Sequence, residues 1–349
     1  MMNATSAEAG AIPLLTIAIP TYNRSGTLSA LLEMLLPQVA AHANVELLVA
    51  NNASPDDTLS VLKEFEQRFA AAGANLHVQS HAINIGSDAN FVWLYHHARG
   101  RYFWLCSDDD LILPGSIDEV VAQLIASAPD LVYVTSYGFR EDWQAERRGD
   151  PLGRMVHTVH SARQFARVVN VMFTFISGII VNKARLESIP HEDPSAYLGT
   201  NLTQLSWTLP LLADMRCGVV LWNRPLAGRQ GHSAGYSIGD VFAARLSENC
   251  IRLLPNHPEI VRQILNPAVR KWFPSAILEA RNSRNQTLSL DTTDVPVRRV
   301  FGRNWRYWLF LWPVFKLPLP LANLWVKAGG FVNKFIYIAH LPGFWRKRT

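Results

Sequence analysis

The 349-residue chain contains only three cysteines, and Cys106, Cys217 and Cys250 are spaced far apart. Three widely separated thiols form neither a zinc-binding pattern nor a disulfide framework, which is typical of proteins in a reducing compartment. Residues 1–11 have neither a basic nor an apolar segment, so we expect no secretory signal there. Before residue 300 there is no run of about 18 consecutive apolar residues, the length that a membrane-spanning helix needs. These absences favour a soluble cytoplasmic body.

Acidic residues are missing from the end of the chain. No Asp or Glu occurs after Asp294, whereas ten Lys and Arg residues do. Because the whole chain carries a net charge of +5, the residues up to Asp294 carry −5. Five of the eleven tryptophans lie at or beyond Trp305. The sequence therefore predicts an acidic body that is followed, from about residue 298, by a basic aromatic tail.

Short apolar runs and helical patterns alternate in the first part of the chain. The expected strands are residues 15–19, 45–50, 76–78, 102–106 and 131–135, and the expected helices are residues 27–39, 57–72, 87–98 and 117–127. Ser25 is the expected cap of the first helix, and Asp56 or Asp57 that of the second. This alternation predicts an α/β fold, Rossmann-like, with a mostly parallel sheet and helices on both faces. In such sheets ligands bind beyond the carboxyl ends of the strands.

The charged segment 141–155 contains Gly and Pro residues and is the expected boundary between two halves. Later apolar runs at 175–181 and 219–222 predict further strands. We expect a flexible N-terminus over residues 1–13 and an α/β domain over 14–240, composed of halves 14–135 and 156–240. Residues 241–349 are expected to form a helical C-terminal region.

Three adjacent carboxylates, Asp108, Asp109 and Asp110, follow the apolar segment 102–106. Like charges at contact distance repel one another, and desolvation increases the cost. A divalent cation such as Mg²⁺ or Mn²⁺ offsets this repulsion, because hard cations prefer carboxylate oxygens. The triplet therefore predicts a metal site that can hold a diphosphate. The alternative is an acidic surface turn with water and counterions.

Four short blocks that follow the predicted strands resemble the family 2 glycosyltransferases of GT-A fold. They read Ile-Pro-Thr-Tyr-Asn-Arg at 19–24, Val-Ala-Asn-Asn-Ala-Ser-Pro-Asp-Asp-Thr at 49–58, Asn-Ile-Gly at 84–86 and Ser-Asp-Asp-Asp at 107–110. Their order and spacing match as well as their content. Segment 84–114 is most similar to the abequosyltransferase-like subgroup. The resemblance implies a nucleotide-diphosphate sugar as donor and Mg²⁺ or Mn²⁺ as cofactor.

The resemblance also assigns roles to individual positions. It implies that the base pocket is lined by Pro20, Thr21 and Tyr22, with Arg24 near the donor. Asn51 stands where the family usually has an Asp that pairs with the base, and an amide can also pair with a base edge. Asn84 and Gly86 are implied donor-binding positions. The resemblance implies that Asp108 contacts the ribose and that Asp109 and Asp110 bind the metal, and Asp108 is a further candidate metal ligand, since the alignment of Ser107 leaves the order of these roles open. Two of the blocks also have a purely structural alternative. Residues 20–23 could be an ordinary strand end, and residues 84–86 could be an Asx turn in which glycine adopts an unusual φ.

Transfer to a hydroxyl requires a general base, since a neutral alcohol is a poor nucleophile. In many relatives the base belongs to a Glu-Asp pair, which is missing near residues 198–201. We predict Asp193 as the catalytic base, with Glu192 as the second candidate and Asp214 as the third. The alternative is that each of these residues is an exposed charge in a loop.

Two further positions are candidates for binding. Arg229 and His232 are expected in a glycine-containing loop, where Arg229 is expected to offset charge on the leaving nucleotide and His232 to bind metal or phosphate. A solvated loop is the alternative. Ser177-Gly178 either admits the acceptor closely or contains a packing glycine.

The basic aromatic tail predicts a peripheral anchor at a bilayer interface, where Trp, Lys and Arg are favoured. Three prolines, Pro313, Pro318 and Pro320, argue against a straight spanning helix. A buried helical subdomain or a spanning hairpin are the alternatives, and a nucleic-acid partner is disfavoured by the acidic body.

The expected function is metal-dependent, inverting transfer of a sugar to a hydroxyl of a polyprenyl-linked saccharide. The expected place is the cytoplasmic face of the bacterial inner membrane, in the synthesis of O-antigen, capsule or exopolysaccharide. The alternatives are a degenerate scaffold at the membrane surface, which Asn51 and the missing acid pair favour, and a sugar nucleotidyltransferase. The latter is disfavoured because no basic, glycine-rich loop follows the first strand.

Overall fold

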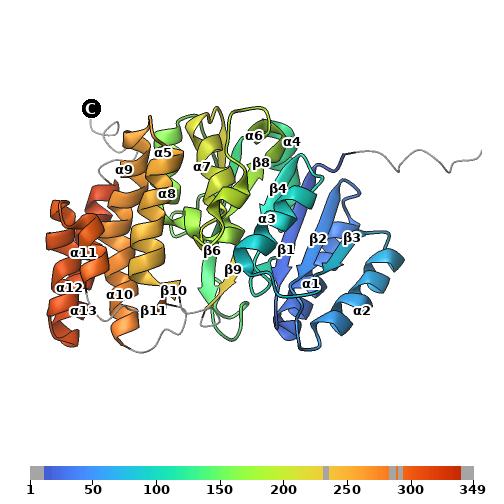
Figure 1. The fold of residues 1–349 in the computed structure, drawn as a ribbon, viewed down its shortest axis with the longest axis horizontal. Helices are drawn as coiled ribbons and strands as arrows, with labels where there is room; N and C mark the ends of the chain where they lie inside the picture. Colours follow the sequence, from blue (N-terminus) through green and yellow to red (C-terminus); the bar gives the residue numbers. More distant parts are fainter. Residues whose placement is uncertain (1–11, 231–235, 283–287, 290–293, 339–349) are drawn as a thin grey trace, which may run out of the picture. The chain divides into compact units, whose positions relative to one another are not determined.

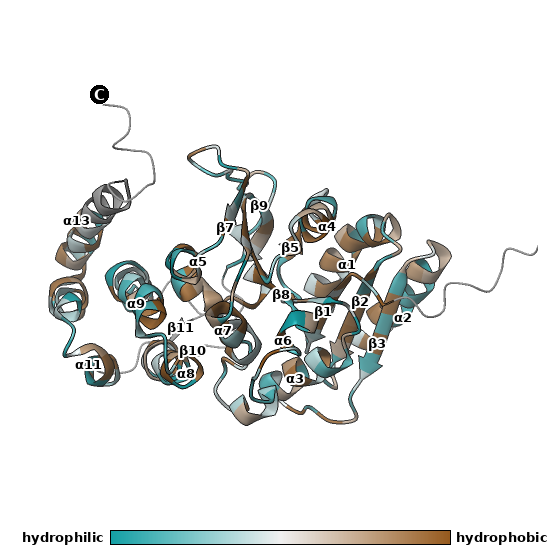
Figure 2. Cartoon of the chain, turned by 90° about the horizontal axis from the view of Figure 1, so that it is seen from above, coloured by the Kyte–Doolittle hydropathy of each residue, from teal (hydrophilic) through white to brown (hydrophobic). Residues whose placement is uncertain are grey.

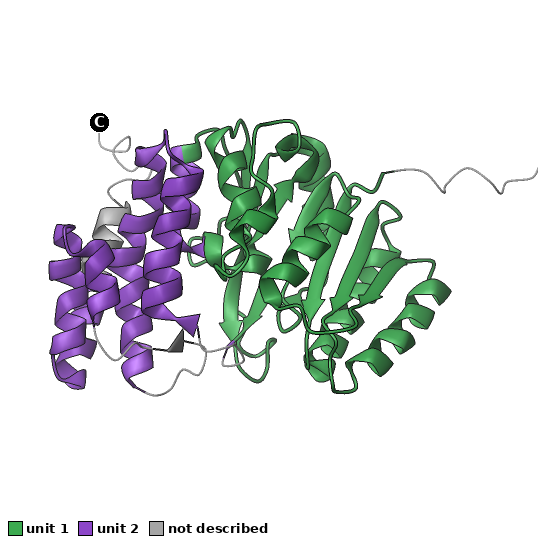
Figure 3. Cartoon of the chain, in the orientation of Figure 1, with its two compact units in different colours: residues 1–162, 173–229 green, residues 163–172, 230–349 purple. Residues whose placement is uncertain are grey.

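A computed structural model of the chain describes residues 12–230, 236–282, 288–289 and 294–338. The chain divides into two compact units (Figure 3). The first unit comprises residues up to 162 together with 173–229, and the second comprises 163–172 together with the residues from 230 onward. The predicted boundary loop at 141–155 thus lies inside the first unit. The sequence places the end of the first domain at residue 240, whereas in the structure the two units divide between Arg229 and Gln230.

Within the described residues, the first unit is built on a nine-stranded sheet with the order β3-β2-β1-β4-β8-β6-β9-β5, and β7 pairs with β9. Pairing is parallel from β3 to β4 and between β6 and β9, and antiparallel elsewhere. The strands are β1 (Leu15–Thr21), β2 (Val45–Asn51), β3 (Asn75–Ser80), β4 (Tyr102–Leu105), β5 (Leu111–Ile112), β6 (Leu131–Phe139), β7 (Val156–Val159), β8 (Ile179–Asn182) and β9 (Gly218–Arg229).

Helices cover both faces of this sheet, as the strand-helix alternation predicts (Figures 1 and 2). They are α1 (Ser25–Ala40), α2 (Thr58–Ala71), α3 (Ser87–His97), α4 (Ser116–Ser127), α6 (Lys183–Leu186) and α7 (Leu205–Ala213), with short 3-10 turns η1 (Asn170–Thr174), η2 (Ile176–Gly178) and η3 (Pro194–Tyr197). Alternate residues of β1 pack with α1, α2 and α4 in one buried apolar cluster. On the opposite face Phe103 packs against Tyr95 of α3 and Trp207 of α7, with ring centroids 5.4 and 5.7 Å away.

The cap of the first helix differs from the predicted one, whereas Asp56 binds the start of the second helix as predicted. Ser25 is the first helical residue of α1 rather than its cap, and its amide donates to Asp56 Oδ2 at 3.0 Å. Asp56 also accepts from the amide and the hydroxyl of Thr58, the first residue of α2. One carboxylate therefore serves the starts of two neighbouring helices, which local sequence spacing alone does not reveal.

The second unit is helical, which confirms the predicted helical C-terminal region. Its elements are α5 (Ala162–Val169), α8 (Leu246–Leu253), α9 (Pro258–Pro267), α10 (Phe273–Arg281), α11 (Val295–Phe301), α12 (Trp312–Lys316) and α13 (Leu319–Ile338), the π-helical segments η4 (Ile238–Arg245), η5 (Ala268–Trp272) and η6 (Tyr307–Leu311), and the short pair β10 (Tyr236–Ser237) and β11 (Leu288–Ser289). None of the helices in the described residues combines the length and the apolar character that crossing a membrane demands.

The strand order places a switch point beside β1. From β1 the chain continues outward to β2 and β3, and β4 then returns to pair with the other edge of β1. In open α/β sheets a crevice opens where the order reverses in this way, beyond the carboxyl ends of the strands. The residues that follow β1 and β4 are therefore the ones to inspect.

Candidate active site

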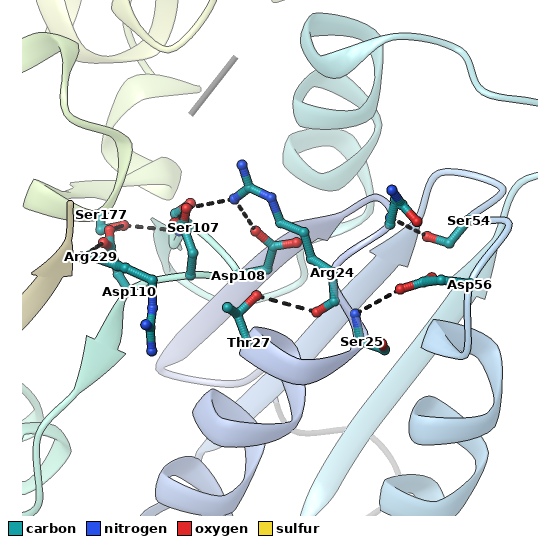
Figure 4. A network of polar contacts seen from close by, with 12 residues as sticks. Arg24, Ser25, Thr27, Ser54, Asp56, Ser107, Asp108, Asp110, Ser177 and Arg229 are labelled. Atoms are coloured by element: carbon teal, nitrogen blue, oxygen red, sulfur yellow. Dashed lines mark hydrogen bonds and ion pairs between the residues drawn. The ribbon is translucent and has the colours of Figure 1, made fainter. Parts of the chain in front are cut away.

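The acidic triplet follows β4 and is buried, with residue exposures of 4, 8 and 4% for Asp108, Asp109 and Asp110. The surface-turn alternative is therefore wrong. Arg24, at the start of α1, reaches across the switch point toward the triplet (Figure 4). Its Nη1 donates to Asp108 Oδ1 at 2.9 Å and to Asp109 Oδ2 at 2.6 Å. Two carboxylates thus converge on one cationic nitrogen.

Hydroxyl and amide groups engage the remaining oxygens of the triplet. Ser107 Oγ donates to Asp109 Oδ1 at 2.5 Å. Ser177 Oγ donates to Asp110 Oδ2 at 2.6 Å, and the amide of Arg229 donates to Asp110 Oδ1 at 3.1 Å. An arginine, two hydroxyls and a backbone amide thus offset part of the charge repulsion within the triplet. Both oxygens of Asp110 are committed to holding β9 and η2.

Burial controls the protonation of the triplet. Desolvation raises the pKa of Asp108 to about 6, although the charge of Arg24 opposes the shift. Desolvation and the neighbouring charge of Asp109 raise the pKa of Asp110 to about 7, against the hydrogen bonds from Ser177 and Arg229. Raised carboxyl pKa values of this kind are found where burial and like charges meet, which is common in functional sites.

The blocks that follow the first four parallel strands form one network, as the sequence predicted. The amide of Asn23 donates to Ser54 Oγ at 2.9 Å, and the amide of Asn52 donates to Thr21 O at 2.9 Å, which joins the turns after β1 and β2. Asn52 Nδ2 then donates to Asn84 Oδ1 at 2.9 Å, which adds the turn after β3. Because Arg24 connects these turns to the triplet, the four blocks lie together at the carboxyl ends of the parallel strands.

The predicted base-pocket residues lie at the end of β1, where Thr21 is buried and Tyr22 is 44% exposed. Asn51 is buried, and its side chain accepts from the Ser54 amide at 3.1 Å and donates to Ser80 Oγ at 3.3 Å. Asn51 therefore shapes the turn after β2 with both of its polar atoms.

The Asn-Ile-Gly block forms an Asx turn. Asn84 Oδ1 accepts from the amide of Gly86 at 2.9 Å, and Gly86 adopts a φ of +86° that favours glycine. Asn52 Oδ1 also accepts from the amide of Ile85 at 2.9 Å. Asn52, which the sequence reasoning assigned no individual role, thus fixes this turn; the doubled Asn after β2 was the signal available.

Ser177 and Gly178 have structural roles beside the triplet. Ser177 is fully buried, and its Oγ accepts from the Ser107 amide at 2.9 Å in addition to donating to Asp110. A Cβ on Gly178 would lie 2.9 Å from Cδ1 of Phe175, so this position is a packing glycine. The alternative in which this pair admits the acceptor is therefore not favoured by the structure.

The candidate bases lie apart from these contacts. Asp193 caps η3, accepts from the Ser195 amide at 2.8 Å and pairs with His96 at 3.5 Å. The hydrogen bonds from Ser195 lower its pKa. Glu192 Oε2 accepts from the hydroxyl of Tyr197 at 3.1 Å. Asp214 pairs with Arg185.

A buried carboxylate that the sequence reasoning missed lies on α3. Asp88 is 7% exposed, and its Oδ2 accepts from the amide of Asn201 at 2.9 Å. Its Oδ1 is buried without a hydrogen-bond partner. Asn201 belongs to the stretch in which the sequence lacks the acid pair, so Asp88 brings a carboxylate to that stretch from the other half of the domain.

The second half contributes to the site through Arg229, whose guanidinium lies 4.7 Å above the ring of Phe139. His232, predicted to bind metal or phosphate, lies outside the described residues. Across the described part of the chain, no three His, Cys, Asp or Glu side chains are arranged as a preformed metal cage. The geometry instead shows two carboxylates on one cation.

Comparison with known proteins identifies the domain. The sequence model of the glycosyl transferase family 2 matches residues 16–187, which include β1–β4, the triplet and Arg24. Residues 16–187 are a family 2 glycosyltransferase domain. The protein is a glycosyltransferase, as the four motif blocks predict, and its α/β fold is the expected GT-A fold.

Individual relatives are distant. The chain is 22% identical over 236 residues to the abequosyltransferase RfbV of Salmonella typhimurium, an alignment that covers 64% of this chain and 68% of that protein. It is 26% identical over 106 residues to the minor teichoic acid biosynthesis protein GgaB of Bacillus subtilis, covering 30% of this chain and 11% of that protein. Among solved structures, S. aureus TarS 1–349 in complex with UDP-GlcNAc matches with a TM-score of 0.59 and 15% identity, over 90% of this chain and 88% of that one.

Proposed function

We propose that this glycosyltransferase transfers a sugar from a nucleotide-diphosphate donor to a hydroxyl of a polyprenyl-linked saccharide during bacterial surface-glycan synthesis. The observation that carries the proposal is the pair of buried carboxylates, Asp108 and Asp109, that converge on Arg24 at the switch point between β1 and β4. Relatives named for abequosyl transfer and for teichoic acid biosynthesis support a role in bacterial glycan synthesis. The solved complex with UDP-GlcNAc supports the class of donor.

A divalent cation fits the oxygens of this site. Asp108 Oδ1 and Asp109 Oδ2 already meet at one cationic nitrogen, and both residues are buried. We therefore assign Asp108 and Asp109 as the residues that would hold Mg²⁺ or Mn²⁺, while Asp110 anchors β9 and η2 beneath them. When bound, the cation would neutralise the charge of the departing diphosphate.

Arg24 contributes to the same charge balance. Its side chain is 29% exposed, so it can turn from the carboxylates toward an anionic ligand in the crevice. A diphosphate brings negative charge to a site that already holds two carboxylates, and a cation on each side of it offsets that charge. We propose that Arg24 exchanges its carboxylate partners for the donor diphosphate when the cation binds.

The acceptor hydroxyl needs a base, and we keep Asp193 as the proposed catalytic base with Glu192 second. Both precede η3, which packs against α3. Asp193 is the N-cap of η3 and an exposed carboxylate beside His96. Inversion by direct displacement is the stereochemical course that we propose.

The test is a panel of nucleotide sugars with different bases and sugars. Each is added with Mn²⁺ or with EDTA, and the melting temperature is measured. A true donor stabilises the native state by mass action, by about 2.7 kcal/mol at a hundred times its dissociation constant. We expect stabilisation by one donor class with Mn²⁺ only, followed by sugar transfer to a lipid-linked saccharide. Absence of stabilisation by every member of the panel would contradict the proposal.

A further inference from the structure

The exposed tryptophans of the described chain all lie within residues 305–325 of the second unit. Trp305, Trp308, Trp312 and Trp325 are 60, 48, 40 and 39% exposed, whereas the other described tryptophans are buried or half-buried. Water contact by large apolar rings is unfavourable, at about 25 cal/mol for each Å² of apolar surface. A group of such rings therefore indicates a contact surface rather than a solvated one.

These rings belong to one continuous surface. The ring centroids of Trp308 and Trp312 are 6.4 Å apart. Trp325 Nε1 donates to the carbonyl oxygen of Leu309 at 3.0 Å, which places α13 beside η6. Leu309 and Leu324 are themselves 45 and 63% exposed. We call this surface the tryptophan face; it comprises Trp305, Trp308, Leu309, Trp312, Leu321, Leu324 and Trp325.

A group of cations adjoins the tryptophan face. The guanidinium of Arg306 lies 4.6 Å from the ring of Trp305. Arg306 and Arg167 also lie close enough to Arg270 to act on it by charge, and Lys271 is acted on by Arg270 and Arg167. Burial lowers the pKa values of Arg270 and Lys271, and repulsion from these neighbours lowers them further. We call the four residues the basic cluster.

The basic cluster is assembled by the fold. Its members come from α5, from the π-helical segment η5 and from the residue before η6. The basic aromatic tail of the sequence contains one of these four residues, so the composition of the tail does not reveal the cluster.

We propose that the tryptophan face and the basic cluster together form a docking surface for a bilayer that contains anionic phospholipids. Indole rings prefer the headgroup level, leucines the acyl boundary and guanidinium groups the lipid phosphates. Charge complementarity selects this occupant, because the face is apolar, its neighbours are cationic and the body of the protein is acidic. Docking needs neither donor nor metal, so its failure is separable from failure of the proposed transfer.

Vesicle flotation of the full chain tests the proposal. We expect binding to vesicles of phosphatidylglycerol and phosphatidylcholine, and much weaker binding to phosphatidylcholine alone. The double substitution Arg270→Gln/Lys271→Gln is expected to weaken partitioning roughly fivefold for each charge removed. The matched control is Lys63→Gln, an exposed lysine on α2 of the first unit, which is expected to leave partitioning unchanged.

The apolar half of the surface is tested in the same way. Trp308→Ser/Trp312→Ser is expected to weaken partitioning roughly tenfold. The control is Ile251→Ser on α8, where an isoleucine is 62% exposed outside the tryptophan face. Should a variant fold poorly, the second measurement uses the wild-type protein with vesicles that contain brominated lipids. Brominated lipids quench the fluorescence of tryptophan rings that reach the membrane, so we expect quenching on binding. Binding equal to neutral and anionic vesicles, binding unchanged in both double variants, or no vesicle binding at all would overturn the proposal.

Discussion

Replacing Arg24 by alanine tests how the acidic triplet is stabilised. The side chains of Asp108 and Asp109 are 5 and 11% exposed, and Arg24 Nη1 contacts both. Removing one partner of a buried ion pair costs about 3–5 kcal/mol, because it leaves an uncompensated buried charge. Since Arg24 is 29% exposed, we expect the lower end of that range, a loss of about 3 kcal/mol in the free energy of unfolding.

Two further expectations make this prediction specific. In an Asp109→Asn background the loss on removing Arg24 should be smaller, because only one charged partner remains. Mn²⁺ should stabilise Arg24→Ala more than the wild type, because in the variant the cation meets two free carboxylates and displaces no guanidinium.

Urea denaturation in EDTA and in Mn²⁺ measures both effects. The control is Arg68→Ala, since Arg68 also holds carboxylates, Glu33 and Glu64, but on the surface, where ion pairs contribute little. The reasoning is refuted if Arg24→Ala unfolds at the same urea concentration as the wild type in EDTA, or if Mn²⁺ stabilises the two proteins equally.

The remaining predictions concern the base, the buried carboxyl and the glycine turn. Asp193→Asn should lower kcat at least a hundredfold with donor binding unchanged, whereas an unaltered kcat in a transfer assay would exclude it as the base. Asp110 has its pKa raised to about 7 in the folded protein, so wild-type stability should fall as pH rises from about 4 to 7. Asp110→Asn should flatten that dependence in melting curves, and an unchanged slope would contradict the shift. Gly86→Ala should destabilise by about 1 kcal/mol because of the φ of +86°, and no loss in urea denaturation would contradict a strained turn.

The sequence could predict that the four polar blocks meet at one place, because the strands that precede them are parallel and neighbours in the sheet. Parallel strands end at the same edge of a sheet, so polar blocks after successive strands must meet there. Asn52, Asn84 and the triplet after β4 follow this rule. The strands and helices of residues 14–135 were predictable for the same reason, since their apolar spacing is set by burial on a sheet with two covered faces.

The partners of the triplet could not be predicted, because they depend on tertiary packing. Arg24 is 85 residues from Asp109, and Ser177 is 67 residues from Asp110. Ser177 reaches the triplet because β8 inserts antiparallel between β4 and β6, and an apolar run does not encode its position in the strand order. Asp88 was missed because one carboxylate in the first turn of a helix resembles an ordinary N-terminal charge.

The most direct test of the account is calorimetric titration of nucleoside diphosphates, UDP, GDP, CDP and TDP, into the wild type and into Asp109→Asn, with Mn²⁺ and with EDTA. The account predicts that at least one of them binds the wild type with Mn²⁺ and not with EDTA, and that Asp109→Asn, folded by circular dichroism, loses this binding. Equal binding to the variant, or binding that EDTA leaves unchanged, would contradict the claim that the carboxylates after β4 hold a cation against the donor diphosphate.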